Sequence, residues 1–215
     1  MRPRSRIALA ALIAALGLTA VAASASANSL EFNDNGFLFR WEPTNRLLFN
    51  AFGFSAQCEW RMKGSFHSTQ IAKTAGNLIG RVTESRIRQS CEGNRGFILN
   101  AHMGESAPNT LPWHLKYRAF GGRLPTITSI TLEVVGLSVL IETALGNCLY
   151  RTTVEEPFAF IGTIEAGGDF TAIRADESST IEGSGGICQP LTPFGTGREI
   201  TTLRSKSIVL NVRLI

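Results

Sequence analysis

Apolar and polar residues alternate with a period of two along most of the chain beyond residue 27. Between Ile130 and Val134 the apolar side chains fall on one face and the polar ones on the other, as a half-buried β-strand requires. The same alternation predicts a strand within Ile208–Leu214, with the even-numbered residues from 210 to 214 facing inward. Further strands are expected at Phe37–Trp41, Leu47–Phe54, Cys58–Phe66, Leu78–Ile87, Gly96–Asn100, Trp113–Phe120, Leu137–Glu142, Cys148–Val154, Phe158–Ile164, Phe170–Arg174 and Glu199–Leu203.

Short turn signals separate these segments, and almost no run has helical spacing. Gly121-Gly122, Gly146-Asn147 and Gly167-Gly168-Asp169 are typical of tight turns between strands. No linker or low-complexity tract divides residues 28 to 215. The pattern predicts a single all-β domain over 28–215, built either as an antiparallel β-sandwich or as a closed β-barrel.

Residues 1 to 27 have the pattern of a secretory signal peptide. A basic start with three arginines leads into an uncharged run of Ala, Leu, Ile and Val that ends at Ala25-Ser26-Ala27. The apolar run is short for a membrane span, which takes about 20 residues. Cleavage is therefore expected before Asn28, which predicts a secreted protein, extracellular or at the cell envelope, with no transmembrane segment after cleavage.

Removal of the leader changes the charge of the protein. The formal net charge of +4 becomes +1 when Arg2, Arg4 and Arg6 are lost. A basic composition is a signature of nucleic-acid binding, but here it belongs mostly to the leader. Nucleic acid is not an expected partner.

Four cysteines, Cys58, Cys91, Cys148 and Cys188, follow the leader. An even count in an exported chain predicts two disulfides, and four cysteines allow three connectivities. We prefer Cys58–Cys91 with Cys148–Cys188, because each pair then closes a local loop and the two loops do not cross. A zinc site is the alternative, but the chain has no Cys-x-x-Cys pair.

Two stretches carry a resemblance to a known group of proteins. GSFHSTQIAK at Gly64–Lys73 and LPWHLKYRAFGGRLPTITSI at Leu111–Ile130 resemble a group of uncharacterised secreted proteins of high-GC Gram-positive bacteria. The resemblance implies export and an all-β fold. The group has no assigned activity, so no functional residue is carried over.

The expected strand from Trp113 to Phe120 has one strongly basic face. Alternation places Trp113, Leu115, Tyr117 and Ala119 on the inner face and His114, Lys116, Arg118 and Phe120 on the outer face. If Arg61 and Lys63 lie on a neighbouring strand, the outer face becomes a cationic patch able to meet phosphates or carboxylates. The alternative is that these charges serve solubility and block edge pairing.

No catalytic or metal motif is complete. Glu182-Gly183-Ser184-Gly185-Gly186 resembles the nucleophile motif of chymotrypsin-like proteases, but Gly183 stands where that motif has Asp. His102, Asp169 and Ser184 occur in the order of a triad without its surrounding motifs. The three histidines of the chain lack metal-ligand spacing, so neither a metal nor another cofactor is expected.

The sequence thus favours a secreted, non-catalytic β-domain that binds an anionic polymer or glycan through His114, Lys116, Arg118, Arg61 and Lys63. The alternative is a secreted hydrolase acting on a polysaccharide or ester, because the acids of a glycosidase are paired in space and not by sequence spacing.

Overall fold

The computed structural model describes residues 29–41, 46–51, 54–87, 91–93, 98–104, 110–184 and 188–215. All of its regular elements are β-strands. They are β1 (Ser29–Phe32), β2 (Gly36–Trp41), β3 (Leu47–Ala51), β4 (Phe54–Cys58), β5 (Trp60–Phe66), β6 (Gln70–Ala72), β7 (Leu78–Ile87), β8 (Glu92–Gly93), β9 (Ile98–Met103), β10 (Trp113–Arg123), β11 (Thr126–Val135), β12 (Ser138–Thr143), β13 (Gly146–Arg151), β14 (Phe158–Ile164), β15 (Phe170–Ala175), β16 (Gly183–Ser184), β17 (Thr192–Phe194), β18 (Thr196–Gly197), β19 (Glu199–Thr202) and β20 (Val212–Leu214).

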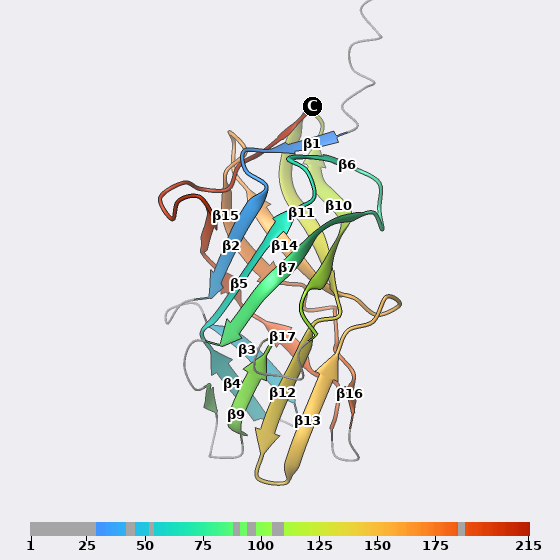
Figure 1. The fold of residues 1–215 in the computed structure, drawn as a ribbon, viewed down its shortest axis with the longest axis vertical. Helices are drawn as coiled ribbons and strands as arrows, with labels where there is room; N and C mark the ends of the chain where they lie inside the picture. Colours follow the sequence, from blue (N-terminus) through green and yellow to red (C-terminus); the bar gives the residue numbers. More distant parts are fainter. Residues whose placement is uncertain are drawn as a thin grey trace, which may run out of the picture.

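The largest sheet curls almost into a barrel (Figure 1). Its nine strands run in the order β18-β15-β14-β11-β10-β7-β5-β2-β19, and every neighbouring pair is antiparallel. The two edge strands, β18 and β19, are separated only by Arg198, so the chain itself passes from one edge of the sheet to the other. The predicted all-β fold with barrel character is confirmed.

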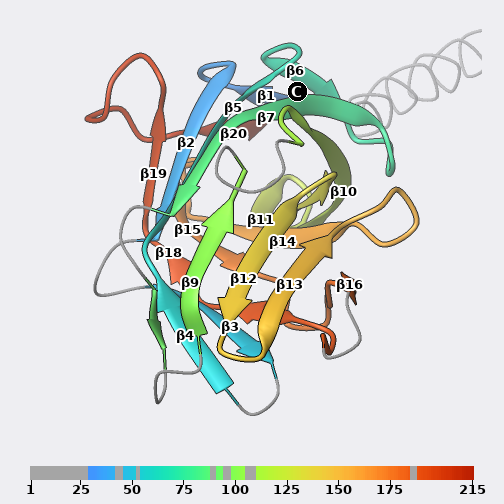
Figure 2. The same cartoon turned by 60° about the horizontal axis from the view of Figure 1, so that its bottom comes forward.

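Three smaller sheets lie at the two ends of this barrel. Strands β20, β1 and β6 form a sheet across one end, where the C-terminal residue also lies (Figure 1). At the other end, β16-β13-β12-β9 and β17-β3-β4-β8 form two four-stranded sheets (Figure 2). The other predicted architecture, an antiparallel β-sandwich, is therefore also present in part.

Aromatic side chains fill the buried side of the barrel strands. The rings of Trp41 and Trp60 stack with their centroids 4.4 Å apart, and Phe160 lies within 5.8 Å of the first and 5.6 Å of the second. Gly162, two residues after Phe160 on β14, makes room for the ring of Phe170, because a Cβ there would lie 2.4 Å from that ring. Trp113, which was predicted to face inward, is also fully buried.

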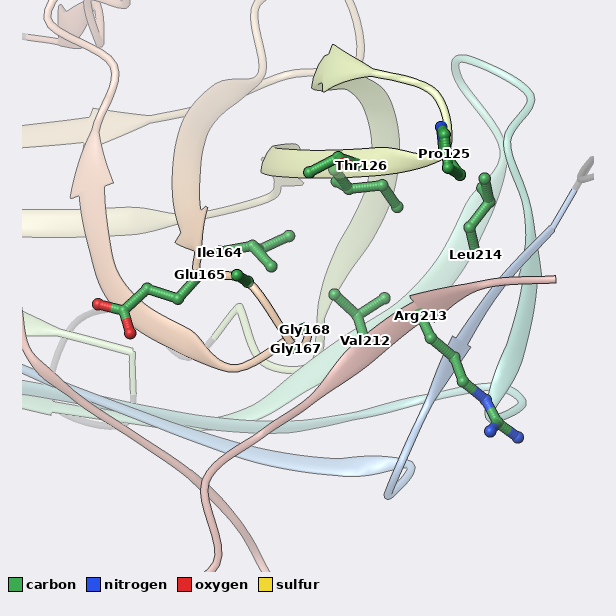
Figure 3. A pocket seen from close by; sticks show the side chains of 11 residues that line it. Pro125, Thr126, Ile164, Glu165, Gly167, Gly168, Val212, Arg213 and Leu214 are labelled. Carbon is green, nitrogen blue, oxygen red and sulfur yellow. The ribbon is translucent and has the colours of Figure 1, made fainter.

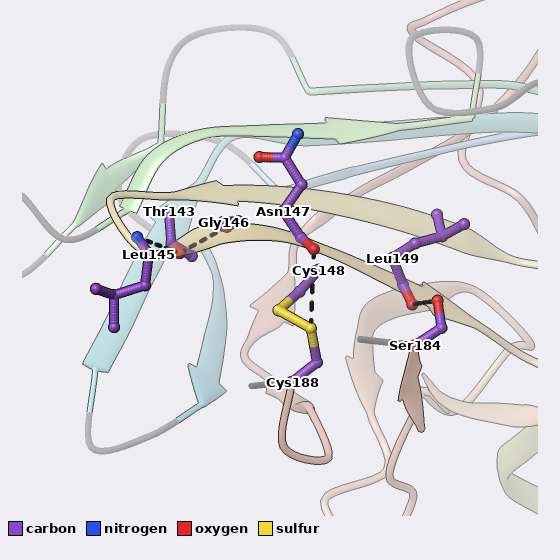
Figure 4. The surroundings of a disulfide bond; sticks show 8 residues. All are labelled: Thr143, Leu145, Gly146, Asn147, Cys148, Leu149, Ser184 and Cys188. Carbon is purple, nitrogen blue, oxygen red and sulfur yellow. Dashed lines mark hydrogen bonds between the residues drawn. A yellow bond between two sulfur atoms is a disulfide. The ribbon is translucent and has the colours of Figure 1, made fainter. Parts of the chain in front are cut away.

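Both preferred disulfides are present. Cys58 bonds to Cys91 and Cys148 to Cys188, and no cysteine is free among the described residues. The second bond ties the long β12–β13 hairpin to the chain that follows β16 (Figure 4). Two disulfides indicate folding in an oxidising environment. None of the described residues belongs to a helix that is long and apolar enough to cross a membrane.

Two of the predicted strands have the same bounds as strands of the structure. Leu78–Ile87 and Phe158–Ile164 have the predicted bounds as β7 and β14. The single strand predicted for Leu47–Phe54 is wrong, because β3 ends at Ala51 and β4 begins at Phe54 as its antiparallel partner. The run LLFNAFGF contains a single polar residue, Asn50, so its pattern did not predict a hairpin.

Candidate basic binding face

The outward side of three adjacent barrel strands carries a group of cationic side chains, which we call the basic face. It consists of Arg61 and Lys63 on β5, Arg81 and Arg86 on β7, and His114, Lys116 and Arg118 on β10. On β5 and at the start of β10, buried residues alternate strictly with these exposed or half-buried ones. Because successive side chains of a strand point to opposite faces, the buried aromatic side of the barrel directs the cations outward.

The strand carrying Arg61 and Lys63 is not a direct neighbour of β10. Strand β7 lies between them, paired with β5 on one side and β10 on the other. The predicted juxtaposition therefore needs correction: β7 separates the two groups and adds two arginines of its own. Arg86 lies opposite Arg61, and Arg81 lies opposite His114.

Glu84 on β7 is surrounded by three of these cations. Lys63 Nζ donates to Glu84 Oε2 over 2.7 Å, Arg61 donates to Oε1, and Arg86 Nε lies 3.8 Å from Oε1. Burial acts to raise the pKa of Glu84, but the hydrogen bond and charge of Lys63 and the charges of Arg61 and Arg86 outweigh it, so the pKa is lowered. The carboxylate stays ionised and neutralises one of the three cations.

Arg118 is turned toward acids on the far side of β10. Its Nε lies 3.6 Å from Glu133 Oε1, and its Nη1 lies 3.8 Å from Asp176 Oδ2. The side chain of Arg118 is half exposed, so these ion pairs are weak, about 0 to 1 kcal/mol each. Arg118 thus stands at the acidic border of the basic face.

A register shift at Arg118 changes the rest of β10. The pairing with β11 moves from Tyr117 directly to Ala119, as in a β-bulge, and Phe120 then lies opposite the fully buried Ile130. The predicted faces are therefore wrong for the last two residues: Ala119 is exposed, and Phe120 is on the inner side. A β-bulge cannot be predicted from the period-two pattern, because no particular residue type identifies the extra residue.

The three remaining cations, Arg81, His114 and Lys116, form what we call the open triad. Within the described part of the chain none of them has a carboxylate within ion-pair distance. Arg81 and His114 are exposed, and Lys116 is half-buried. Arginine offers a planar fork of donors, lysine a compact charge, and histidine a donor whose charge depends on pH, so together they suit a carboxylate, sulfate or phosphate group.

Arg81 is the residue that sequence reasoning missed. It is exposed on a correctly predicted strand, although Ile79, two positions before it, is buried. Strict alternation would put both residues on one face, but a shift in the pairing of β7 with Leu115 and Lys116 separates them. Only the order of strands in the sheet places Arg81 beside His114.

One pocket lies away from this face, at the end of the barrel covered by β20 (Figure 3). It has a volume of about 550 Å³, and Ile127, Ile164, Val212 and Leu214 contribute to its lining. The charged lining side chains, Glu165 and Arg213, extend away from its centre (Figure 3).

The residues of the incomplete protease pattern have other partners. Ser184 Oγ donates to the carbonyl of Leu149 over 3.0 Å (Figure 4), and His102 Nε2 lies 3.3 Å from Glu142 Oε1. Asp169 accepts a hydrogen bond from the side chain of Asn211 over 2.8 Å. In the described ranges no group of three or more His, Cys, Asp or Glu residues is placed to hold a metal ion.

Comparison of the chain with protein-family models, with curated proteins and with solved structures finds no match.

Proposed function

We propose that this protein is a secreted, non-catalytic β-domain that binds an anionic polymer or glycan at the cell envelope, with the open triad as the anchor. Export is supported by the signal-peptide pattern of residues 1 to 27 and by the two disulfides. The observation that carries the binding proposal is the contrast within the basic face. Arg61, Lys63, Arg86 and Arg118 have acid partners, whereas no carboxylate of the described residues lies within ion-pair distance of Arg81, His114 or Lys116.

Cationic side chains without a nearby carboxylate are suited to binding an external anion. An exposed cation that has no acid partner loses no ion pair when an external anion arrives, so the whole of the new interaction adds to affinity. Each exposed contact contributes at most about 1 kcal/mol, and three such contacts, about 3 kcal/mol together, give a Kd no tighter than about 6 mM for one anionic group. Useful affinity at this face requires a ligand with several charges.

The experiment is a titration calorimetry comparison at low and at physiological salt, with hyaluronan and heparin as the anionic polymers. We expect salt-sensitive binding that the double variant Arg81→Ala/Lys116→Ala loses at least tenfold. The matched control is Arg174→Ala, which removes an exposed arginine from β15, on another part of the same barrel. Equal loss in the control would show that only the overall charge matters, and turnover of a polymer would favour the alternative of a hydrolase.

A further inference from the structure

Three segments that are distant in the sequence form the pocket at the end of the barrel covered by β20, which we call the end pocket. Residues 125–127, 164–168 and 212–214 line it (Figure 3). Its volume of about 550 Å³ falls within the range of about 300 to 1,000 Å³ that is typical of small-molecule sites, which often lie in the mouths of β-barrels. The class of ligand follows from the residues that line and adjoin the pocket.

Backbone contacts hold one side of the end pocket in place. The Val212 N–H donates to the carbonyl of Gly168 over 2.9 Å, and Asn211 Nδ2 donates to the carbonyl of Gly167 over 2.8 Å. Gly168 has a φ of 94°, and a Cβ there would lie 2.2 Å from the carbonyl oxygen of Val212, so glycine is required for the turn to come this close to β20. This side of the pocket is therefore formed before a ligand arrives.

The buried side chains of the end pocket are aliphatic. Ile127, Ile164 and Val212 are at most 8 % exposed. Two more apolar side chains, Leu124 and Ile215, are next in the chain to lining residues and are 54 % and 38 % exposed. None of the described lining residues is aromatic, so a sugar ring or a flat aromatic ligand has no ring to stack on. A flexible hydrocarbon chain is the ligand that buries the most apolar surface here.

One cation without an acid partner adjoins the end pocket. Arg123 is exposed and lies opposite the lining residue Thr126, and no carboxylate of the described residues is within ion-pair distance of it. Arg213, by contrast, donates from Nε to Glu31 Oε2 over 2.5 Å. The carboxylate of Glu165 points away from the pocket, on the side remote from the turn that contains Arg123 (Figure 3). The mouth beside Arg123 therefore suits an anionic head group.

We propose that the end pocket binds a single-chain carboxylate of the fatty-acid class, with its hydrocarbon chain in the pocket and its head group at Arg123. Binding there does not depend on the proposed function, because the basic face lies on the outward side of β5, β7 and β10. Burial of the chain supplies most of the affinity, and the exposed arginine orients the molecule with its carboxylate at the mouth.

The finite volume of the end pocket determines how affinity depends on chain length. Each buried methylene group is expected to tighten binding by up to about fourfold, until the chain fills the pocket. Carbon atoms beyond that length stay outside and add little. The ion pair with the exposed Arg123 contributes less, at most about fivefold at low salt.

The test is calorimetric titration of the full protein at low salt with octanoate, dodecanoate and hexadecanoate, each below its critical micelle concentration. We expect dodecanoate to bind at least about tenfold more tightly than octanoate, with a smaller further gain for hexadecanoate. Dodecanol has the same chain as dodecanoate without the charge, and it is expected to bind up to about fivefold more weakly.

Variants at the mouth separate the chain from the head group. Thr126→Trp places a large ring at an exposed lining position and is expected to weaken dodecanoate and dodecanol at least about tenfold. Ala166→Trp, on the β14–β15 turn, is expected to do the same, so the result does not rest on one variant. The matched control is Thr128→Trp, which adds the same ring at an exposed position of β11 outside the pocket lining. Arg123→Gln is expected to reduce the affinity for dodecanoate to that for dodecanol and to leave dodecanol unchanged.

Several results would contradict this assignment. Affinity that does not change with chain length, or an equal loss in Thr128→Trp, would refute a hydrocarbon chain in the end pocket. Equal affinity of the wild type for dodecanoate and dodecanol would refute the role of Arg123. If no monomeric fatty acid binds, the inference is wrong, and binding to anionic phospholipid vesicles would then indicate a membrane surface instead. Hyaluronan and heparin binding is expected to be unchanged in Thr126→Trp, so failure of this site and failure of the proposed function appear in different titrations.

Discussion

Replacing Glu84 by Gln is expected to destabilise the fold and to strengthen binding of a polyanion. The wild-type carboxylate receives donors from Lys63 and Arg61 and lies near Arg86, while its side chain is only 19 % exposed. Glutamine keeps one acceptor oxygen but loses the charge that holds three cations together. Charge-assisted hydrogen bonds contribute about 1.5 to 3 kcal/mol each when shielded and exposed ion pairs less than about 1, so a loss of about 1 to 2 kcal/mol in the free energy of unfolding is expected.

The pH dependence of this loss follows from the lowered pKa of Glu84. A carboxyl group with a folded pKa below its unfolded value stabilises the fold above the unfolded pKa, here the ordinary value of 4.5. That stability is lost as pH falls through the folded pKa, when the wild type becomes protonated too. The difference between wild type and Glu84→Gln is therefore constant near neutral pH and declines below about pH 4.5.

Urea unfolding between pH 3 and pH 7 measures this effect, and hyaluronan titration at pH 7 measures the gain in binding. The control is Glu156→Gln, which removes an exposed carboxylate from a loop and is expected to change neither quantity. A Glu84→Gln protein with unchanged stability at pH 7 and unchanged affinity would show that Glu84 does not balance the cations, and the account of the basic face would be wrong.

Other predictions concern the core and the leader. Ser85→Ala is expected to lower the free energy of unfolding by about 1 to 3 kcal/mol, because the buried indole N–H of Trp60 loses its acceptor, 2.8 Å away. An equal loss of stability in a variant that replaces an exposed serine would refute this explanation. Gly162→Ala is expected to lower stability by about 1 to 3 kcal/mol, since the new Cβ would overlap the ring of Phe170, and an unchanged thermal midpoint would contradict that packing. Intact mass of the exported protein is expected to begin at Asn28 with no free thiol, and a retained leader would contradict export.

The sequence was informative where residues interact with their neighbours along the chain. The strand signals located β7 and β14. Alternation identified the outward face of β10 as far as Arg118, because side-chain direction in a regular strand depends only on position. Loop size was enough to prefer the two observed disulfides. These features need no knowledge of distant parts of the chain.

The arrangement of the basic face could not be predicted in the same way. Which strand lies beside β10 depends on pairing between distant segments, and the interposed β7 both separates Arg61 from His114 and supplies Arg81. The acid that neutralises Lys63 lies 21 residues further along the chain, so the contrast between paired and unpaired cations is invisible before the sheet is assembled.

Closure of the barrel by β19 has a consequence for the order of folding. Arg40 on β2 forms its ion pair with Glu199 on β19, 159 residues further along the chain. During synthesis the backbone edge of β2 therefore lacks its final neighbour until Glu199 has been made, 159 residues after Arg40. Contacts between such distant segments slow folding, and an uncovered strand edge can pair with another chain in the meantime. The protein is thus most exposed to aggregation before β19 has paired with β2, and a molecule truncated ahead of Glu199 would keep that edge open permanently.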